Sequence, residues 1–179
     1  QWLRKYPHHS TENLRGNLQK RLNKLNAANW GGAIFAQAGL ERLNLLRNKF
    51  TVLDWMIPAP AQGSIVITSI KDHDNITQIC RELNHIETEI CIEVERTFFN
   101  LLNGDNSCAI GALAFIKEED IHFKGILLSS GGRKKIEITR IEKLADSDKI
   151  APYCANFIIE RGGKKLVDKS MGTEQNVNI

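Results

Sequence analysis

Leucines near the start of the chain recur at the spacing of an amphipathic helix. They are Leu14, Leu18, Leu22 and Leu25. Their positions predict a helix over residues 17–28, with Asn17 as its N-cap and Gly16 easing the turn into it. A short apolar run at 33–36 predicts a buried strand, and a second helix is expected to run through Leu43 and Leu46. Helix, strand and helix in this order indicate part of an α/β lobe rather than a whole one.

The middle of the chain predicts a stiff connection between two structured regions. Residues 58–63 contain two prolines, each of which fixes its own φ and disfavours helix before it. The β-branched run at 64–70 then predicts a strand, although its partners are not obvious within the chain. Two helices are expected to follow, over about 74–83 and 87–102.

Beyond residue 108 the hydrophobic period changes to two, which is typical of β-strands. Three strands are predicted, over 109–116, 121–129 and 134–141. A last helix is expected to follow Asp148 and to end at Gly162-Gly163. Residues of about 84–163 therefore predict a small α+β domain with a three-stranded antiparallel sheet, and the polar tail after residue 172 is expected to fray.

Composition narrows the class of protein. The 179 residues are 42% hydrophobic and 25% charged, which is ordinary for a globular protein. No apolar stretch approaches the roughly 18 residues of a membrane helix, so no membrane association is expected. The four cysteines are scattered without a CxxC pair, which favours a reducing cytoplasm over a disulfide scaffold or a zinc ribbon. The histidines show no metal-ligand spacing, so no metal is expected.

Charge is concentrated at the start of the chain. The overall formal charge is +3, but residues 1–50 hold nine basic and two acidic side chains, a net +7. This imbalance favours an anionic ligand, which could be nucleic acid, phosphate or a polycarboxylate. The alternative is a solvated helix face that binds nothing. Residues 1–6 also resemble the end of a helix already under way, so the chain is expected to be a portion of a longer protein.

Two kinds of residue could carry chemistry. Arg15 precedes a predicted helix start, where a guanidinium and unpaired backbone N–H groups together form a site for a carboxylate or phosphate. Arg42 is expected at a second such turn, from strand to helix. Cys108 follows a helix in a polar turn, where its reactivity would depend on thiolate character. The plainer alternatives are surface arginines and an inert, buried cysteine.

Taken together, these segments resemble the porphobilinogen deaminase family, also called hydroxymethylbilane synthase. The resemblance covers about residues 2–116, and each motif alone is weaker than the ordered series. The matching segments are Leu14-Arg15-Gly16-Asn17, Arg21-Leu22, Lys24-Leu25, residues 36–43 (AQAGLERL), Pro58 through Gln62-Gly63, Asn84-His85 with Glu87-Thr88, Glu95-Arg96, and the turn from Gly104 to Ala114.

The resemblance implies a fold of three domains, the first two being α/β lobes that resemble periplasmic binding proteins. On this basis residues 1–63 form part of the second lobe and residues 64–83 a strand and connection returning toward the first. Residues 84–179 form the third, cofactor-attachment domain. The first domain, which carries the family's catalytic Asp, is expected upstream of Gln1. No catalytic residue is therefore expected in this chain, which should be inactive alone.

The resemblance also implies a transferase of tetrapyrrole and heme biosynthesis. Such enzymes condense four porphobilinogens into hydroxymethylbilane with release of ammonia, on a dipyrromethane cofactor joined to a Cys by a thioether. The expected partners are porphobilinogen and the growing polypyrrole, with no nucleic acid, and the complete enzyme is expected to be a cytoplasmic monomer. The cofactor- and substrate-binding positions are Arg15, Gly16, Arg21 and Arg42, the cofactor attachment is at Cys108, and the hinge is Gln62-Gly63.

The chain departs from the family pattern in three places. An ungapped match puts Asn106 at the attachment position, whereas an insertion and a compensating deletion put Cys108 there; Cys108 is the favoured assignment. Cys91 stands where relatives usually carry Arg, and Pro60-Ala61 stiffens the hinge. Two alternative functions remain: a nucleic-acid-binding module that uses the basic first third, and a non-catalytic anion-sensing relative.

Overall fold

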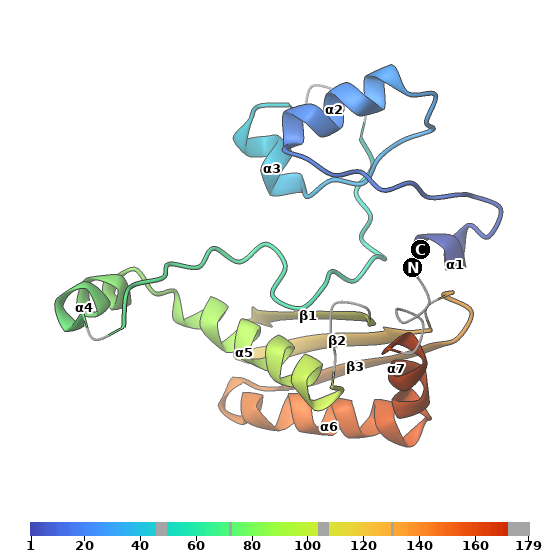
Figure 1. The fold of residues 1–179 in the computed structure, drawn as a ribbon. Helices are drawn as coiled ribbons and strands as arrows, with labels where there is room; N and C mark the ends of the chain where they lie inside the picture. The colour runs from blue at the N-terminus through green and yellow to red at the C-terminus, as the bar shows by residue number, and fades with distance from the viewer. Residues whose placement is uncertain (46–49, 72, 104–107, 130, 172–179) are drawn as a thin grey trace. The chain divides into compact units, whose positions relative to one another are not determined.

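The structure is a computed structural model that describes residues 1–45, 50–71, 73–103, 108–129 and 131–171. The chain divides into two compact units (Figure 1). The first unit comprises residues 2–54, and the second comprises Gln1 and the chain from Trp55 onward. Among the helices of the described ranges, none combines the length and the apolar character needed to cross a bilayer.

The first unit contains three helices: α1 (Trp2–Lys5), α2 (Leu18–Ala27) and α3 (Gln37–Arg42). The predicted start of α2 is confirmed, because the Asn17 side chain accepts a hydrogen bond from the Lys20 backbone N–H at 2.9 Å. Helix α3 ends earlier than predicted. Asn44 takes a left-handed φ of 54°, which terminates the helix, and residues 46–49 lie outside the described part of the chain.

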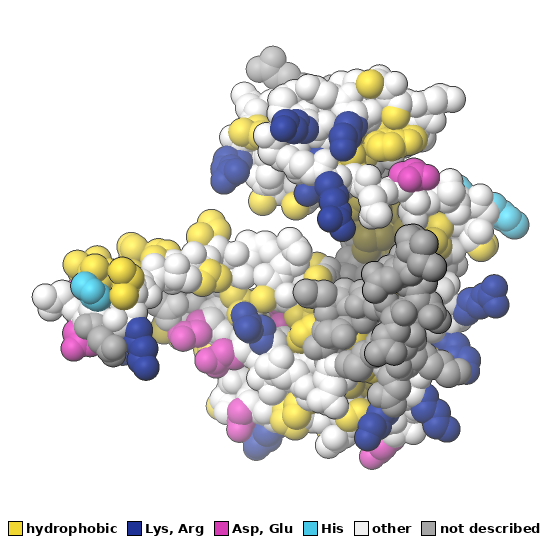
Figure 2. Space-filling model, viewed as in Figure 1, with side chains coloured by type: hydrophobic (Ala, Val, Ile, Leu, Met, Phe, Trp, Pro, Cys, Tyr) yellow, Lys and Arg dark blue, Asp and Glu magenta, His cyan; other side chains and the backbone are white. Residues whose placement is uncertain are grey.

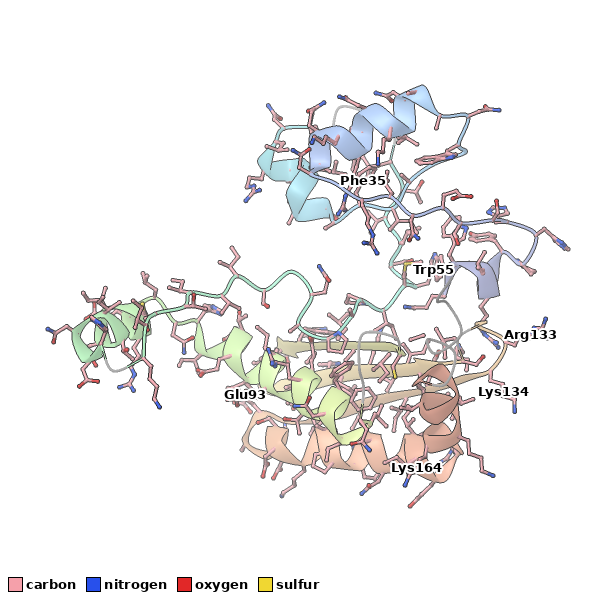
Figure 3. All side chains as sticks on the ribbon, viewed as in Figure 1. Phe35, Trp55, Glu93, Arg133, Lys134 and Lys164 are labelled. Carbon is pink, nitrogen blue, oxygen red and sulfur yellow. The ribbon has the colours of Figure 1, made fainter. Side chains whose placement is uncertain are left out.

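Two predicted strands are wrong. Residues 33–36, which include Phe35 (Figure 3), and residues 64–70 form neither strand nor helix. Ile34 is 52% exposed and Ile65 is 95% exposed, so neither segment is buried. A strand is stable only when its N–H and C=O groups pair with a neighbour, and the described residues supply no neighbour to either segment. The α/β lobe therefore remains a prediction from the family resemblance.

The second unit contains the predicted three-stranded sheet. Strands β1 (Ala109–Lys117), β2 (Asp120–Leu128) and β3 (Lys135–Lys143) are antiparallel, in the order β1-β2-β3. In this register Lys124 lies opposite Leu113 on one side and Thr139 on the other. The strands confirm the change of period to two after residue 108.

Helices cover one face of this sheet. The predicted helices are confirmed as α4 (Asp74–Glu82), α5 (Ile86–Leu101) and α6 (Ser147–Glu160), with a short 3-10 turn, η1 (Leu144–Asp146), before α6. Helix α5 packs on β1, α6 packs on β3, and the two helices contact each other (Figure 1). The core lies between these layers and includes Phe98 and Phe123, whose rings meet edge to face with centroids 5.0 Å apart.

A final helix was not predicted. Gly162, with a φ of 88°, ends α6 as expected, but Gly163 begins α7 (Gly163–Met171). A Cβ at Gly163 would lie 2.7 Å from the carbonyl oxygen of Ile158, so only glycine permits this tight join. The tail predicted to fray, after residue 172, lies outside the described residues.

Candidate functional site

The arginine-containing turn before α2 has the geometry that the sequence predicted. Gly16 takes a φ of 119°, and a Cβ there would lie 3.3 Å from the Cβ of Lys20. Glycine is therefore the residue that allows the chain to enter α2 at this angle. Because Asn17 caps the helix, the turn and the first turn of α2 form one local structure.

Two cationic side chains of α2 fold back onto this turn. Arg21 donates from Nε to the Gly16 carbonyl oxygen at 2.7 Å, and Lys24 donates from Nζ to the Arg15 carbonyl oxygen at 3.4 Å. The bond to Gly16 uses one of the five N–H donors of the guanidinium, so Arg21 is oriented but retains donors for a ligand. Arg15 itself is exposed in the turn. The structure thus gathers three basic residues at a helix N-terminus, an arrangement that suits carboxylates or phosphates.

Arg42 lies elsewhere than predicted. It is the last residue of α3, not part of a strand-to-helix turn, because residues 33–36 are not a strand. Its neighbour one turn earlier, Gly39, faces α2: a Cβ there would lie 3.7 Å from the Leu18 side chain. Residues at i and i+3 share a helix face, so Arg42 lies on the face of α3 that contacts the start of α2.

The hinge residues Gln62 and Gly63 lie in a tight turn of the second unit. The Gln62 N–H donates to the Ala59 carbonyl oxygen at 3.0 Å, and the Ser64 hydroxyl donates to the Ala61 carbonyl oxygen at 2.8 Å. Ala61 takes a left-handed φ of 59° and Gly63 a φ of 92°. A left-handed φ strains an alanine, so contacts with the surrounding structure must stabilise this conformation.

Glu95 on α5 holds this turn. One carboxylate oxygen accepts the Ala61 N–H at 2.6 Å, and the other accepts the Ala114 N–H of β1 at 2.7 Å. Glu95 is 7% exposed. Burial raises the pKa of its carboxyl group, and the hydrogen bonds from Ala114 and Ala61 partly oppose that rise. The sequence indicates Glu95 only through the family resemblance and does not predict this role, although a charged residue on the buried side of an apolar helix is a detectable signal.

The segment before the turn covers the outer edge of β1. The Ala112 N–H donates to the Pro58 carbonyl oxygen at 3.0 Å, two residues along the strand from the Glu95 contact at Ala114. Cys91, one turn before Glu95, accepts a hydrogen bond from the Ile116 backbone. Its thiol pKa is raised, chiefly by burial and then by the charges of Glu95 and Glu87. An edge strand otherwise exposes unpaired groups, so these contacts satisfy alternate N–H groups of β1.

A cleft of about 360 Å³ opens beside the hinge turn. Its walls come from the turn, from the first half of α5 and from the end of β1. Gln62, Gly63, Cys91 and Glu95 are among the lining residues. The cleft therefore lies beside both the predicted hinge and Cys91.

Cys108 lies immediately before β1. It is half-buried and packs against the edge of the core, and its carbonyl oxygen accepts the Ile110 N–H at 2.9 Å. The four cysteines all fall in the described ranges and none forms a disulfide. Cys154 is fully buried, which raises its thiol pKa to about 12. Cys108 is thus better placed than Cys154 for modification, and Asn106, the competing register, lies outside the described residues.

The donor set suits a polycarboxylate bound by arginines better than a metal ion. Within the described ranges, no group of three or more His, Cys, Asp or Glu residues could hold a metal. Figure 2 shows dark-blue Lys and Arg side chains across the visible face of the first unit, with few acidic ones. This balance agrees with the net +7 of residues 1–50.

Comparison with known proteins shows which family models match the chain. The family model "Porphobilinogen deaminase, dipyromethane cofactor binding domain" matches residues 1–78. The model "Porphobilinogen deaminase, C-terminal domain" matches residues 89–160. The α2 turn and the hinge lie in the first match, and Glu95 and Cys108 lie in the second.

Curated relatives carry the same name. Porphobilinogen deaminase of Nitrobacter hamburgensis is 34% identical over 166 residues, which are 92% of this chain and 52% of the relative. The Listeria welshimeri protein is 30% identical, over 94% of this chain and 56% of the relative. The chloroplastic enzyme of Oryza sativa is 34% identical, over 90% and 44%. The chain spans about half the length of the curated relatives it matches, and with both family models it belongs to the porphobilinogen deaminase family.

Proposed function

We propose that this chain acts in tetrapyrrole and heme biosynthesis as the cofactor-binding and C-terminal parts of a porphobilinogen deaminase. The reaction is a transferase reaction: four porphobilinogens and one water give hydroxymethylbilane and four molecules of ammonia. The observation that carries the proposal is the α2 turn, where Arg21 is fixed to Gly16 at 2.7 Å inside the region matched by the cofactor-binding model.

The arginines bind carboxylates in this proposal. Each pyrrole unit brings two carboxylates, so the growing chain is a dense polyanion. Arg15 and Arg21 lie at one turn, and Arg42 lies on the α3 face that contacts α2. A planar guanidinium holds a carboxylate through two parallel hydrogen bonds. These residues orient the substrate and the polypyrrole by their carboxylates and leave the pyrrole carbons accessible.

The dipyrromethane cofactor is proposed to be held by Cys108 through a thioether. When bound, it supplies an anchored pyrrole end to which porphobilinogen units are added. Cys108 suits this role because it is half-buried. It packs against the edge of the core, and its sulfur can be reached from outside the core. The Asn106 register remains the alternative attachment position.

The hinge is proposed to be the segment Gln62-Gly63, with Glu95 as the residue that positions it. The Glu95 carboxylate joins the turn at Ala61 to β1 at Ala114. A strained turn held by a buried side chain is a defined pivot rather than a loose linker. The segment 64–70, exposed and rich in β-branched residues, is proposed to become a strand of the first lobe when that lobe is present.

The catalytic Asp is proposed to lie outside this chain, so the chain alone should not form hydroxymethylbilane. The complete enzyme is proposed to work as a monomer. Four cysteine thiols without a disulfide support a reducing compartment such as the cytoplasm.

Calorimetric titration with porphobilinogen tests the proposed site. Arg21→Lys removes the planar fork and keeps the charge, so affinity is expected to fall about tenfold. Arg4→Lys, the same substitution on α1, is the matched control and should leave affinity unchanged. Equal affinities for Arg21→Lys and the unaltered chain would contradict the site. Preferred binding of single-stranded DNA, with a steep salt dependence, would favour the nucleic-acid-binding alternative.

A further inference from the structure

A second hollow, of about 550 Å³, lies in the second unit, and the described residues that line it are all different from those that line the cleft at the hinge. It opens between the β2–β3 hairpin and the join of α6 to α7. Among the lining residues that the structure describes, five have cationic side chains and none is acidic. The cations are Arg133, Lys134, Lys135, Arg161 and Lys165. We call this hollow the basic groove.

The hairpin side of the basic groove is a closed turn. The Ser129 N–H donates to the Lys134 carbonyl oxygen at 3.0 Å, and the Lys134 N–H donates to the Ser129 hydroxyl oxygen at 3.1 Å. Gly132 also donates to the Ser129 carbonyl oxygen at 2.7 Å. These bonds fix the backbone that carries Arg133 and Lys134, which Figure 3 labels on the hairpin. Both side chains therefore extend from one ordered turn.

The helix side is also ordered. The guanidinium carbon of Arg161 lies 3.5 Å from the centroid of the Phe157 ring, so the planar group is held over an aromatic face. The left-handed Gly162 and the close approach of Gly163 to Ile158 start α7 at the groove wall. The first N–H groups of a nine-residue helix add partial positive charge there.

One cation of the basic groove pairs with an acidic side chain on the same strand. Lys135 forms an ion pair with Glu137, which lies outside the lining. Ile136 and Leu166 supply apolar wall. Figure 2 shows dark-blue side chains along the side of the molecule where Figure 1 places the hairpin and α7. Cationic side chains that gather in one hollow attract anions to it.

We propose that the basic groove binds a compact small-molecule polyanion, with carboxylate or phosphate groups, at a site separate from the α2 turn. Its volume falls within the range of small-ligand pockets. Nucleic acid typically needs an extended basic track with aromatic stacking platforms, whereas these cations are confined to one hairpin and one helix join. The inference does not depend on the proposed enzyme activity.

Nuclear magnetic resonance titration of the full chain tests this site with two probes, tripolyphosphate and benzene hexacarboxylate. The amides of Gly132, Gly162 and Lys165 are expected to shift with either probe. The probe that binds more tightly identifies the phosphate or carboxylate source. Lys134→Gln/Lys165→Gln should weaken binding at these amides by at least about tenfold, because two of five cations are removed.

Lys117→Gln/Lys124→Gln is the matched control, since both lysines are exposed on the same sheet and outside the groove. It should leave binding at the groove amides within about twofold. The proposal is overturned if the groove amides do not shift, or if both double variants weaken binding equally. It is also overturned if single-stranded DNA binds the groove more tightly than both small probes.

Discussion

The Glu95 carboxylate accepts the backbone N–H of Ala61 at 2.6 Å, across 34 residues of sequence. Its second oxygen accepts the N–H of Ala114 at 2.7 Å, so one buried side chain fastens the hinge turn to the edge of the sheet. Backbone hydrogen bonds to a carboxylate are stronger than those between neutral groups. The position of the proposed hinge therefore depends on a residue outside the hinge.

Replacing Glu95 by Gln should destabilise the second unit. The amide has one acceptor oxygen, so the N–H of either Ala61 or Ala114 loses its partner. Leaving a buried donor unsatisfied costs about 1–3 kcal/mol, measurable as a lower urea midpoint. Glu93→Gln is the matched control on the same helix; Glu93 is exposed (Figure 3) and its replacement should change stability by less than about 0.5 kcal/mol. Equal effects of the two substitutions would contradict the role of Glu95.

The pH dependence of stability should carry the signature of Glu95. Burial raises the pKa of its carboxyl group above the ordinary value of 4.5 in the folded state, so the native protein binds the proton more tightly than the unfolded chain. The contribution of this group is then full below pH 4.5 and declines as pH rises through the folded pKa. Urea unfolding across this range should show the stability advantage of the unaltered chain over Glu95→Gln shrinking as pH rises. An advantage that grows with pH would show that the pKa is lowered instead.

The parts of the fold that the sequence predicts depend on residues close together in the chain, whereas the parts that it does not predict depend on tertiary contacts. Helix α2 and its cap at Asn17 follow from local sequence. The three strands of the sheet follow one another along the chain and pair with their neighbours, so the sheet could be predicted as well. Residues 33–36 and 64–70 have the composition of strands, but pairing is a tertiary property that composition cannot supply. Helix α7 was missed because Gly162-Gly163 was interpreted as an end, whereas Gly163 also starts the next helix.

The candidate site shows the same division. The turn at Gly16 was predicted because a glycine before an N-cap is a local signal, and the structure places Arg21 on it. The roles of Glu95 and of the cleft depend on contacts between residues far apart in sequence. Arg42 was assigned to the wrong kind of turn because that assignment depended on the strand at 33–36.

Gly16→Ala should weaken the start of α2. The residue would have to keep a φ of 119° with a Cβ 3.3 Å from the Cβ of Lys20. A left-handed backbone costs a non-glycine residue about 1–2 kcal/mol, so amide exchange in α2 should quicken and porphobilinogen affinity should fall. Gly32→Ala, with no atom within 4 Å of the new Cβ, is the control. Unchanged exchange in Gly16→Ala would contradict the geometry of the turn.

Gly111→Ala should release the segment before the hinge from β1. The new Cβ would lie 3.0 Å from the Ile57 carbonyl oxygen and 3.1 Å from that of Pro58. Since Pro58 accepts the Ala112 N–H, the amide of Ala112 should lose protection from hydrogen exchange. Protection of the Ala112 amide that matches the unaltered chain would show that the segment does not depend on this close approach.

The intact mass of the protein, isolated from cells that make porphobilinogen, tests the proposed function most directly. We expect a mass increase equal to one dipyrromethane, lost in Cys108→Ala and retained in Cys91→Ala. A protein of unmodified mass would contradict cofactor attachment, and an adduct that survives in Cys108→Ala would contradict the assignment of Cys108.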